Sequence, residues 1–217
     1  MTLRLSQAEV LQTGLKAARG AGLPHGLDLD AAANVTWLAA CGIDGVSLLA
    51  GELVEEFRTA PGRLSELENG VLQLRTGWQS GLVLAPAAVD LALLGRSVQV
   101  PGCRAVALVV AEAARRASAG LMLAVRWSGE CGAEEIICEG DGSALGPLDR
   151  LPAIATVIVA PSGKDGCRTG PRFSPSSGSL TVDPAIWAVI AEAAARTLVE
   201  SSPRSRSGAG AEVDDSE

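Results

Sequence analysis

A single histidine is the residue best suited to proton transfer in this chain. His25 lies in the sequence Gly22-Leu23-Pro24-His25-Gly26, in a turn between two expected helices. Because imidazole titrates near neutral pH, His25 is the candidate catalytic residue. A loop histidine that takes no part in catalysis is the plainer alternative, since no nucleophile motif accompanies it.

Arginines near both ends of the chain could bind an anion. Arg19 precedes the histidine turn, and Arg196 and Arg206 lie near the C-terminus together with Ser202 and Ser205. Guanidinium groups hold carboxylates and phosphates through paired hydrogen bonds. We therefore predict that these five residues bind an anionic small molecule. The alternative is a frayed terminus that happens to be rich in arginine and serine.

Other chemistries lack the patterns that they need. The five cysteines are widely spaced without a Cys-x-x-Cys pair, and there is one histidine, so we expect neither disulfides nor a metal site. No Walker loop or GxGxxG fingerprint occurs, and we expect no cofactor. Cysteines in apolar segments act mostly as small hydrophobes. Cys167, in a loop beside Arg168, is the candidate for a reactive thiol.

Composition narrows the classes of partner. The net charge of −7 and the 3% aromatic content argue against a nucleic-acid partner, which needs basic patches and stacking platforms. The apolar run at residues 105–111 is far short of the roughly 20 residues that cross a bilayer. With 47% hydrophobic residues the chain can bury a core. We expect a soluble cytoplasmic protein that binds neither nucleic acid nor membrane.

The elements that must position these residues begin with three helices. Ser6 and Glu9 form a capping box that starts the first helix. A second helix is expected to start near Asp28 or Asp30, where acidic residues favour the helix dipole, and a third to follow Asp44. These spacings predict a helical subdomain over residues 1–60.

Strand and helix patterns mix over residues 61–200. Strands at 71–74 and 82–84 are predicted to form a hairpin, and Pro86 to sit in the first turn of a helix. Further expected elements are strands at 98–100, 121–127, 135–139 and 153–160, a helix at 104–118, a loop at 161–180 and a long C-terminal helix capped by Asp183. This mixture predicts a single α+β domain over residues 1–200, with the helical subdomain packed on a mixed or antiparallel sheet. Residues 201–217 form an Arg/Ser/Gly-rich and then acidic tail.

Two stretches of the chain carry a family resemblance. They are Lys16-Ala17-Ala18-Arg19-Gly20-Ala21-Gly22-Leu23-Pro24 with Gly26 and Trp37-Leu38, and Ala195-Arg196-Thr197 with Ser202, Ser205-Arg206 and Gly208-Ala209-Gly210-Ala211. Together they resemble an uncharacterised proteobacterial family, domain of unknown function 3726. The resemblance implies that the first loop and the tail matter and that the tail is ordered. The family pattern has an aromatic residue near His25 and Tyr-Val-Pro in place of Leu198-Val199-Glu200, so a site using that Tyr would be altered here.

Two functions of different classes fit these patterns. The first is a small-molecule-binding protein or cofactor-free enzyme of bacterial metabolism that acts on an anionic metabolite. The second is a non-catalytic accessory or scaffold subunit of a partner enzyme, and a homodimer is compatible with both. A polar pocket near His25 would favour the first function. An exposed apolar patch on the first three helices would favour the second.

Overall fold

The computed structural model describes residues 2–53, 62–77, 79–118, 120–129, 132–162 and 170–197. Its helices are α1 (Gln7–Gly20), α2 (Leu27–Ala40), α3 (Gly45–Glu52), α4 (Gly81–Leu93), α5 (Val106–Arg116) and α6 (Pro184–Ala195), with a short 3₁₀ turn at Leu148–Arg150. Its strands are β1 (Leu3–Leu5), β2 (Arg63–Glu66), β3 (Leu72–Arg75), β4 (Val98–Arg104), β5 (Met122–Gly129), β6 (Gly132–Cys138), β7 (Ala144–Leu145), β8 (Ile154–Ser162), β9 (Arg172–Phe173) and β10 (Leu180–Val182). The predicted α+β class is confirmed.

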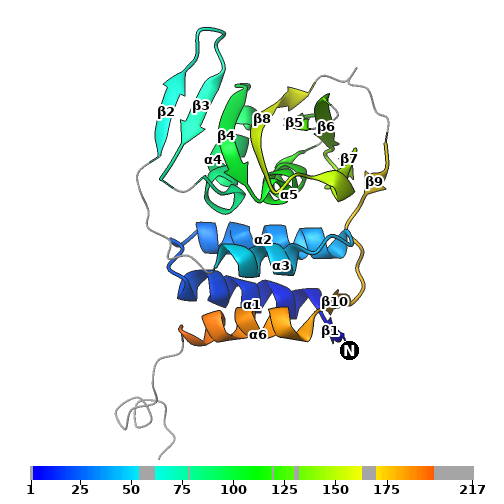
Figure 1. Ribbon diagram of the computed structural model, residues 1–217. Helices are drawn as coiled ribbons and strands as arrows, with labels where there is room; N and C mark the ends of the chain where they lie inside the picture. Colours follow the sequence, from blue (N-terminus) through cyan, green and yellow to red (C-terminus); the bar gives the residue numbers. More distant parts are fainter. Residues whose placement is uncertain are drawn as a thin grey trace, which may run out of the picture.

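Helices α1, α2, α3 and α6 stack below the sheet (Figure 1). The predicted capping box is present, because Ser6 accepts from the backbone of Glu9 and the Glu9 side chain accepts from the backbone of Ser6. Asp44 caps α3, and Asp183 caps α6 with Pro184 in the first turn. Three of these four helices, α1, α3 and α6, therefore begin at the capping residues that the sequence indicates.

The main sheet has eight strands in the order β2-β3-β4-β8-β5-β6-β7-β9. Its neighbours pair antiparallel except β3 and β4, which are parallel, so the prediction of a mixed sheet is confirmed. The predicted hairpin across residues 129–132 joins β5 and β6. A register shift interrupts β4 between Val100 and Cys103, and the strand continues past Pro101-Gly102 rather than ending there.

The prediction of a hairpin between residues 71–74 and 82–84 is wrong. The first segment pairs with β2 instead, and the second is the first turn of α4. The side chain of Ser80 accepts a hydrogen bond from the backbone of Leu82 and starts this helix, so Pro86 lies inside it. A short apolar run does not distinguish a strand from a buried helix, and most of α4 is buried.

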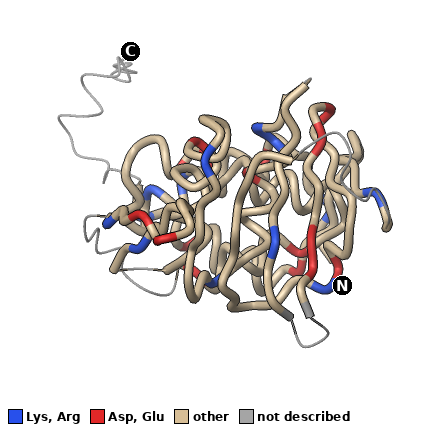
Figure 2. Tube along the Cα trace, turned by 90° about the horizontal axis from the view of Figure 1, so that it is seen from above, with Lys and Arg blue, Asp and Glu red and all other residues tan. Residues whose placement is uncertain are grey.

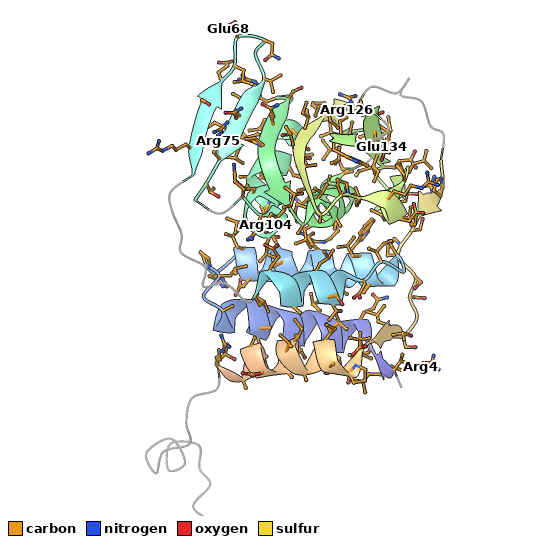
Figure 3. The ribbon with its side chains drawn as sticks, in the orientation of Figure 1. Arg4, Glu68, Arg75, Arg104, Arg126 and Glu134 are labelled. Carbon is orange, nitrogen blue, oxygen red and sulfur yellow. The ribbon has the colours of Figure 1, made fainter. Side chains whose placement is uncertain are left out.

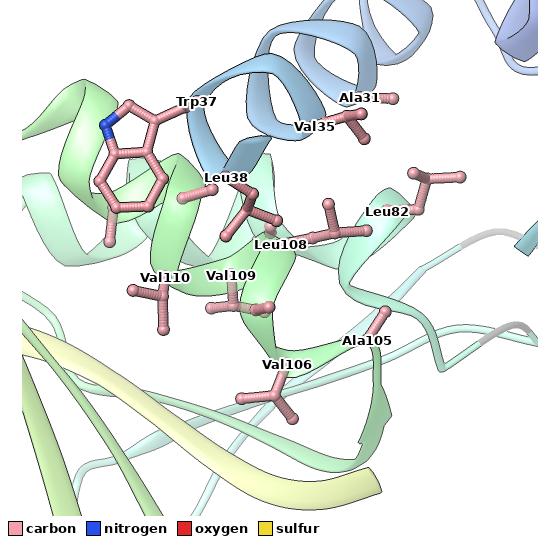
Figure 4. Close-up of a cluster of buried hydrophobic side chains, with 14 of the residues drawn as sticks. Ala31, Val35, Trp37, Leu38, Leu82, Ala105, Val106, Leu108, Val109 and Val110 are labelled. Atoms are coloured by element: carbon pink, nitrogen blue, oxygen red, sulfur yellow. The ribbon is translucent and has the colours of Figure 1, made fainter. Parts of the chain in front are cut away.

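Helices α4 and α5 lie between the sheet and α2 (Figure 1). Val35 and Leu38 of α2 face Leu108 and Val109 of α5 and Leu82 of α4 in one cluster (Figure 4). All five side chains are at most 1% exposed. The helical layer is thus attached to the sheet through α4 and α5.

A charged network lies where α2, α4 and α5 meet. The carboxylate of Glu112 is fully buried and accepts from Arg115 Nη1 at 3.0 Å and Arg116 Nη1 at 3.2 Å. Arg115 Nη1 also donates to Asn34 Oδ1 on α2 at 2.6 Å, and Arg116 pairs with Asp90 on α4. This network joins all three helices through one buried carboxylate.

The chain returns to α1 through residues 170–183, which overlap the end of the loop expected at residues 161–180. Two short strands occur there, and β10 pairs antiparallel with β1, which was not predicted. Leu5 faces Leu180, and Leu3 faces Val182. Strands of two or three residues leave little alternation in the sequence, which explains why these elements were missed.

Two helical glycines are expected to respond in opposite ways to substitution by alanine. Gly20 lies where α1 packs against α6, and Gly51 lies in open space on α3. A Cβ at Gly20 would overlap the carbonyl oxygen of Ala193, whereas a Cβ at Gly51 on α3 would have nothing within 4 Å. We expect Gly20→Ala to destabilise the fold by about 1–3 kcal/mol through overpacking. We expect Gly51→Ala to stabilise it by about 0.5–1 kcal/mol through helix propensity. Urea denaturation measures both, and a stabilising Gly20→Ala would contradict the packing of α6 on α1.

Candidate functional site

Arg19 and His25 lie together at one end of the helical layer, on either side of Asp28. Arg19 Nε donates to Asp28 Oδ2 at 2.9 Å, and Arg19 Nη2 forms an ion pair with the same oxygen, also at 2.9 Å. His25 Nδ1 is 3.9 Å from Asp28 Oδ1, and the histidine side chain is 91% exposed. The fold therefore brings two of the predicted site residues to one carboxylate, which the sequence had indicated only as a helix start.

Asp28 anchors the start of α2. Its side chain is fully buried, and Oδ1 accepts from the backbone of Gly26 at 2.9 Å and of Leu29 at 2.8 Å. Burial raises the pKa of Asp28, but the hydrogen bonds from Arg19, Gly26 and Leu29 outweigh burial and hold the pKa below its ordinary value. Arg19 is therefore committed in part to a structural role, although half of its side chain remains exposed.

Arg196 lies beside the same end of α1. A Cβ at Gly20 would be 3.3 Å from the Cβ of Arg196, so the last residues of α1 and α6 are neighbours. Both arginines stand in or just after the last turn of a helix, where a cation is favoured by the helix dipole. Ser202, Ser205 and Arg206 lie outside the described residues, so their part in an anion site stays a prediction.

The described cysteines are poor candidates for nucleophiles. Burial raises the pKa of the Cys41 thiol to about 11. Burial, with the nearby charge of Glu52, raises the pKa of Cys103 to about 12, and burial raises that of Cys138 as well. These thiols stay protonated at neutral pH. Cys167, the predicted reactive candidate, is not among the residues that the structure describes.

A cavity of about 440 Å³ lies at the other end of the helical layer. It is formed where the α2–α3 corner meets the chain that leads into α6. Its lining residues are Ala39, Ala40, Gly42, Ile43, Asp44, Val46, Ser176, Ser179, Leu180, Thr181 and Asp183. Since α2 starts near His25 and ends at Ala40, the length of that helix separates the two places by about 20 Å.

The polar groups of the cavity are held by local hydrogen bonds. Asp44 accepts from the backbone of Ser47 at 3.0 Å and from its hydroxyl at 2.6 Å. Asp183 Oδ1 accepts from the backbone of Ala185 at 2.7 Å. Ser179 Oγ accepts from Arg4, with Nη2 at 2.8 Å. Fixed carboxylates and hydroxyls can orient a small polar ligand.

Sequence reasoning missed this cavity because its two walls are more than 100 residues apart in the chain. Asp44 and Asp183 were identified as helix caps, and Ser176 and Ser179 were placed in a long loop. A backbone hydrogen bond from Ser176 to the carbonyl of Ala40, 3.0 Å long, fixes the loop across the α2–α3 corner. Nothing in the local sequence around either wall indicates this contact.

Across the described ranges, no group of three or more His, Cys, Asp or Glu side chains is arranged to hold a metal ion. Within those ranges no helix combines the length and the apolar character needed to span a bilayer. Acidic and basic residues are both scattered over the described trace (Figure 2).

Residues 5–73 match a family model described as "Protein of unknown function (DUF3726)". This match confirms the resemblance over the N-terminal part of the chain, which contains Arg19, His25 and one wall of the cavity. The C-terminal residues quoted for the resemblance lie beyond the matched range. No curated protein matches the chain.

The chain is weakly similar to three solved structures. A malate dehydrogenase from Pyrococcus horikoshii OT3 is 13% identical with a TM-score of 0.48, covering 73% of this chain and 50% of its own. A malate dehydrogenase from Entamoeba histolytica is 12% identical with a TM-score of 0.47, covering 76% and 51%. A sulfolactate dehydrogenase from Methanocaldococcus jannaschii is 10% identical with a TM-score of 0.45, covering 87% and 67%. The chain spans about half the length of the two malate dehydrogenases, and similarity at this level carries no functional inference.

The buried Asp28 predicts a pH-dependent stability. Because its folded-state pKa lies below the ordinary 3.8, its contribution is fully present above that pH and is lost as the pH falls through the lower folded-state value. We expect Asp28→Asn to lose about 2 kcal/mol at neutral pH and the loss to shrink in strong acid. Urea denaturation across pH measures this, with the exposed Asp149→Asn as control. A loss that did not vary with pH would contradict the ionised Arg19–Asp28 pair.

Proposed function

We propose that this protein binds a small molecule in the cavity between the α2–α3 corner and residues 176–183. The observation that supports this proposal is the cavity itself. Its volume of about 440 Å³ falls within the roughly 300–1,000 Å³ typical of small-molecule sites. Its lining combines apolar side chains such as Ile43 and Leu180 with a few fixed carboxylates and hydroxyls, as ligand sites commonly do.

The second candidate is the predicted anion site at the opposite end of the helices. The adjacency of Gly20 and Arg196 favours it, because that contact brings Arg19 and Arg196 to the same end of α1 and α6. In this proposal the two guanidinium groups hold an anionic metabolite, and His25 moves a proton at the exposed surface. The bond from Arg19 to Asp28 weighs against it, since part of the guanidinium is already used.

The accessory-subunit hypothesis has less support. It needs an exposed apolar patch on α1, α2 and α3. Among the described residues, the exposed large apolar side chains are instead spread over different elements: Leu29 on α2, Leu64 on β2, Leu94 after α4, Ile154 on β8 and Val189 on α6. Only Leu29 lies on the first three helices.

A thermal-shift screen with cavity-blocking variants tests the proposed function. Wild type is screened against small sugars, amines, amino acids, carboxylates and phosphates. A ligand present at 100 times its dissociation constant stabilises the protein by about 2.7 kcal/mol. We expect Ser179→Trp, whose indole would fill the cavity, to abolish this shift. Ser177→Trp, on an exposed neighbour outside the lining, should keep it.

The same screen separates the two candidate sites. A shift that survives in Ser179→Trp contradicts binding in the cavity. A shift that is caused by an anion and lost in Arg196→Gln would support the second candidate instead. A shift that Arg196→Gln retains and Ser179→Trp removes is the outcome that the cavity proposal expects.

A further inference from the structure

The charges that line the cavity have one sign. Among the described residues that line it, Asp44 and Asp183 carry charge, and none is a Lys, Arg or His. An anionic ligand would face two carboxylates, whereas a cation would be attracted by both. The exposed side chain of Arg4 reaches Ser179 from β1 at the outer edge of the molecule (Figure 3). Arg4 is not part of the lining.

Two helix N-termini at the cavity do not offset these charges. Helices α3 and α6 both begin there, and free backbone amides at a helix start would favour an anion. Here the amides of Ser47 and Ala185 already donate to the carboxylates of Asp44 and Asp183. The two aspartate side chains therefore occupy the positions at which an external anion would bind these amides. A ligand entering the cavity meets their negative charge.

The polar atoms still available in the cavity suit a ligand that donates hydrogen bonds. Asp183 Oδ1 is used by Ala185, while Oδ2 has no hydrogen bond to any residue that the structure describes. Ser179 Oγ accepts from both Nε and Nη2 of Arg4, which leaves the hydroxyl proton to be donated elsewhere. The cavity can thus accept from ammonium and hydroxyl groups and can donate to a ligand hydroxyl.

We infer that this cavity selects a positively charged molecule that carries hydroxyl groups, of the class of amino sugars and amino alcohols. The ammonium group lies between Asp44 and Asp183, and the ligand hydroxyls bond to Ser176, Ser179 and Thr181. The apolar side of the cavity, formed by Ile43, Val46 and Leu180, covers the carbon skeleton. This inference rests on the proposed function, because it names the ligand class of the same cavity.

Three sugars of nearly equal size and different charge test this inference. Glucosamine, glucose and glucuronate share a hexose ring and are positive, neutral and negative at slightly acidic pH. We expect isothermal titration calorimetry with the full chain to show that glucosamine binds at least about tenfold more tightly than glucose, with no binding of glucuronate. Equal affinity for glucose and glucosamine, tighter binding of glucuronate or no binding of glucosamine would overturn the inference.

Charge-removing variants make the test specific to the two carboxylates. Asparagine caps a helix about as well as aspartate, so Asp44→Asn and Asp183→Asn remove charge while the helix starts remain. Each is expected to weaken glucosamine binding by about tenfold, and Asp149→Asn, an exposed acid outside the lining, is expected to leave it unchanged. Equal weakening by all three variants would show a general charge effect and overturn the inference.

Failure of the inference and failure of the proposed function give different results. If a neutral or anionic molecule binds and Ser179→Trp blocks it, the cavity is the site and the ligand class is wrong. If glucosamine binds and Ser179→Trp does not block it, the proposed function fails, and the inference fails with it.

Discussion

The buried carboxylate of Glu112 is the constraint on which the arrangement of layers depends. Burial, with the nearby charge of Asp30, raises the pKa of Glu112, and the hydrogen bond with Asn34 and the charges of Arg115 and Arg116 offset this only in part. A charge removed from water costs several kcal/mol unless its partners stay in place. Arg115 reaches α2 through Asn34, and Arg116 reaches Asp90 on α4. Movement of α2 relative to α5 would therefore break the Asn34 contacts of this network, whereas Arg115 and Arg116, on α5 itself, would stay beside Glu112.

The position of α2 in turn fixes both candidate sites. Its first turn holds Asp28, which fastens Arg19 and the His25 turn. Its last residue, Ala40, accepts the backbone hydrogen bond of Ser176, which holds one wall of the cavity against the α2–α3 corner. The two sites sit at opposite ends of one helix with opposite polarity: the C-terminal ends of α1 and α6 carry arginines, and the N-terminal ends of α3 and α6 carry aspartates. Helix dipoles account for both placements.

The sequence predicted those elements whose starts or pairing depend on neighbouring residues in the chain. The caps at Ser6, Asp44 and Asp183 marked helix starts, and alternation marked the β5–β6 hairpin. Prediction failed where tertiary contacts decide, as for the start of α4, whose apolar residues look the same in a strand and in a buried helix. The site followed the same rule. The neighbourhood of Arg19 and His25 could be anticipated from spacing, whereas the cavity needed the pairing of β1 with β10 and the path of residues 176–183.

Amide NMR tests most directly whether ligand binds at the α2–α3 corner rather than at the end of the helices that carries Arg19 and Arg196. During a titration of isotope-labelled protein with glucosamine, we predict that the resonances of Gly42, Asp44, Ser179 and Thr181 shift in proportion to occupancy. The resonances of residues 19–26 and of Arg196 should stay in place. Shifts confined to residues 19–26 and Arg196, with the corner unchanged, would contradict the account.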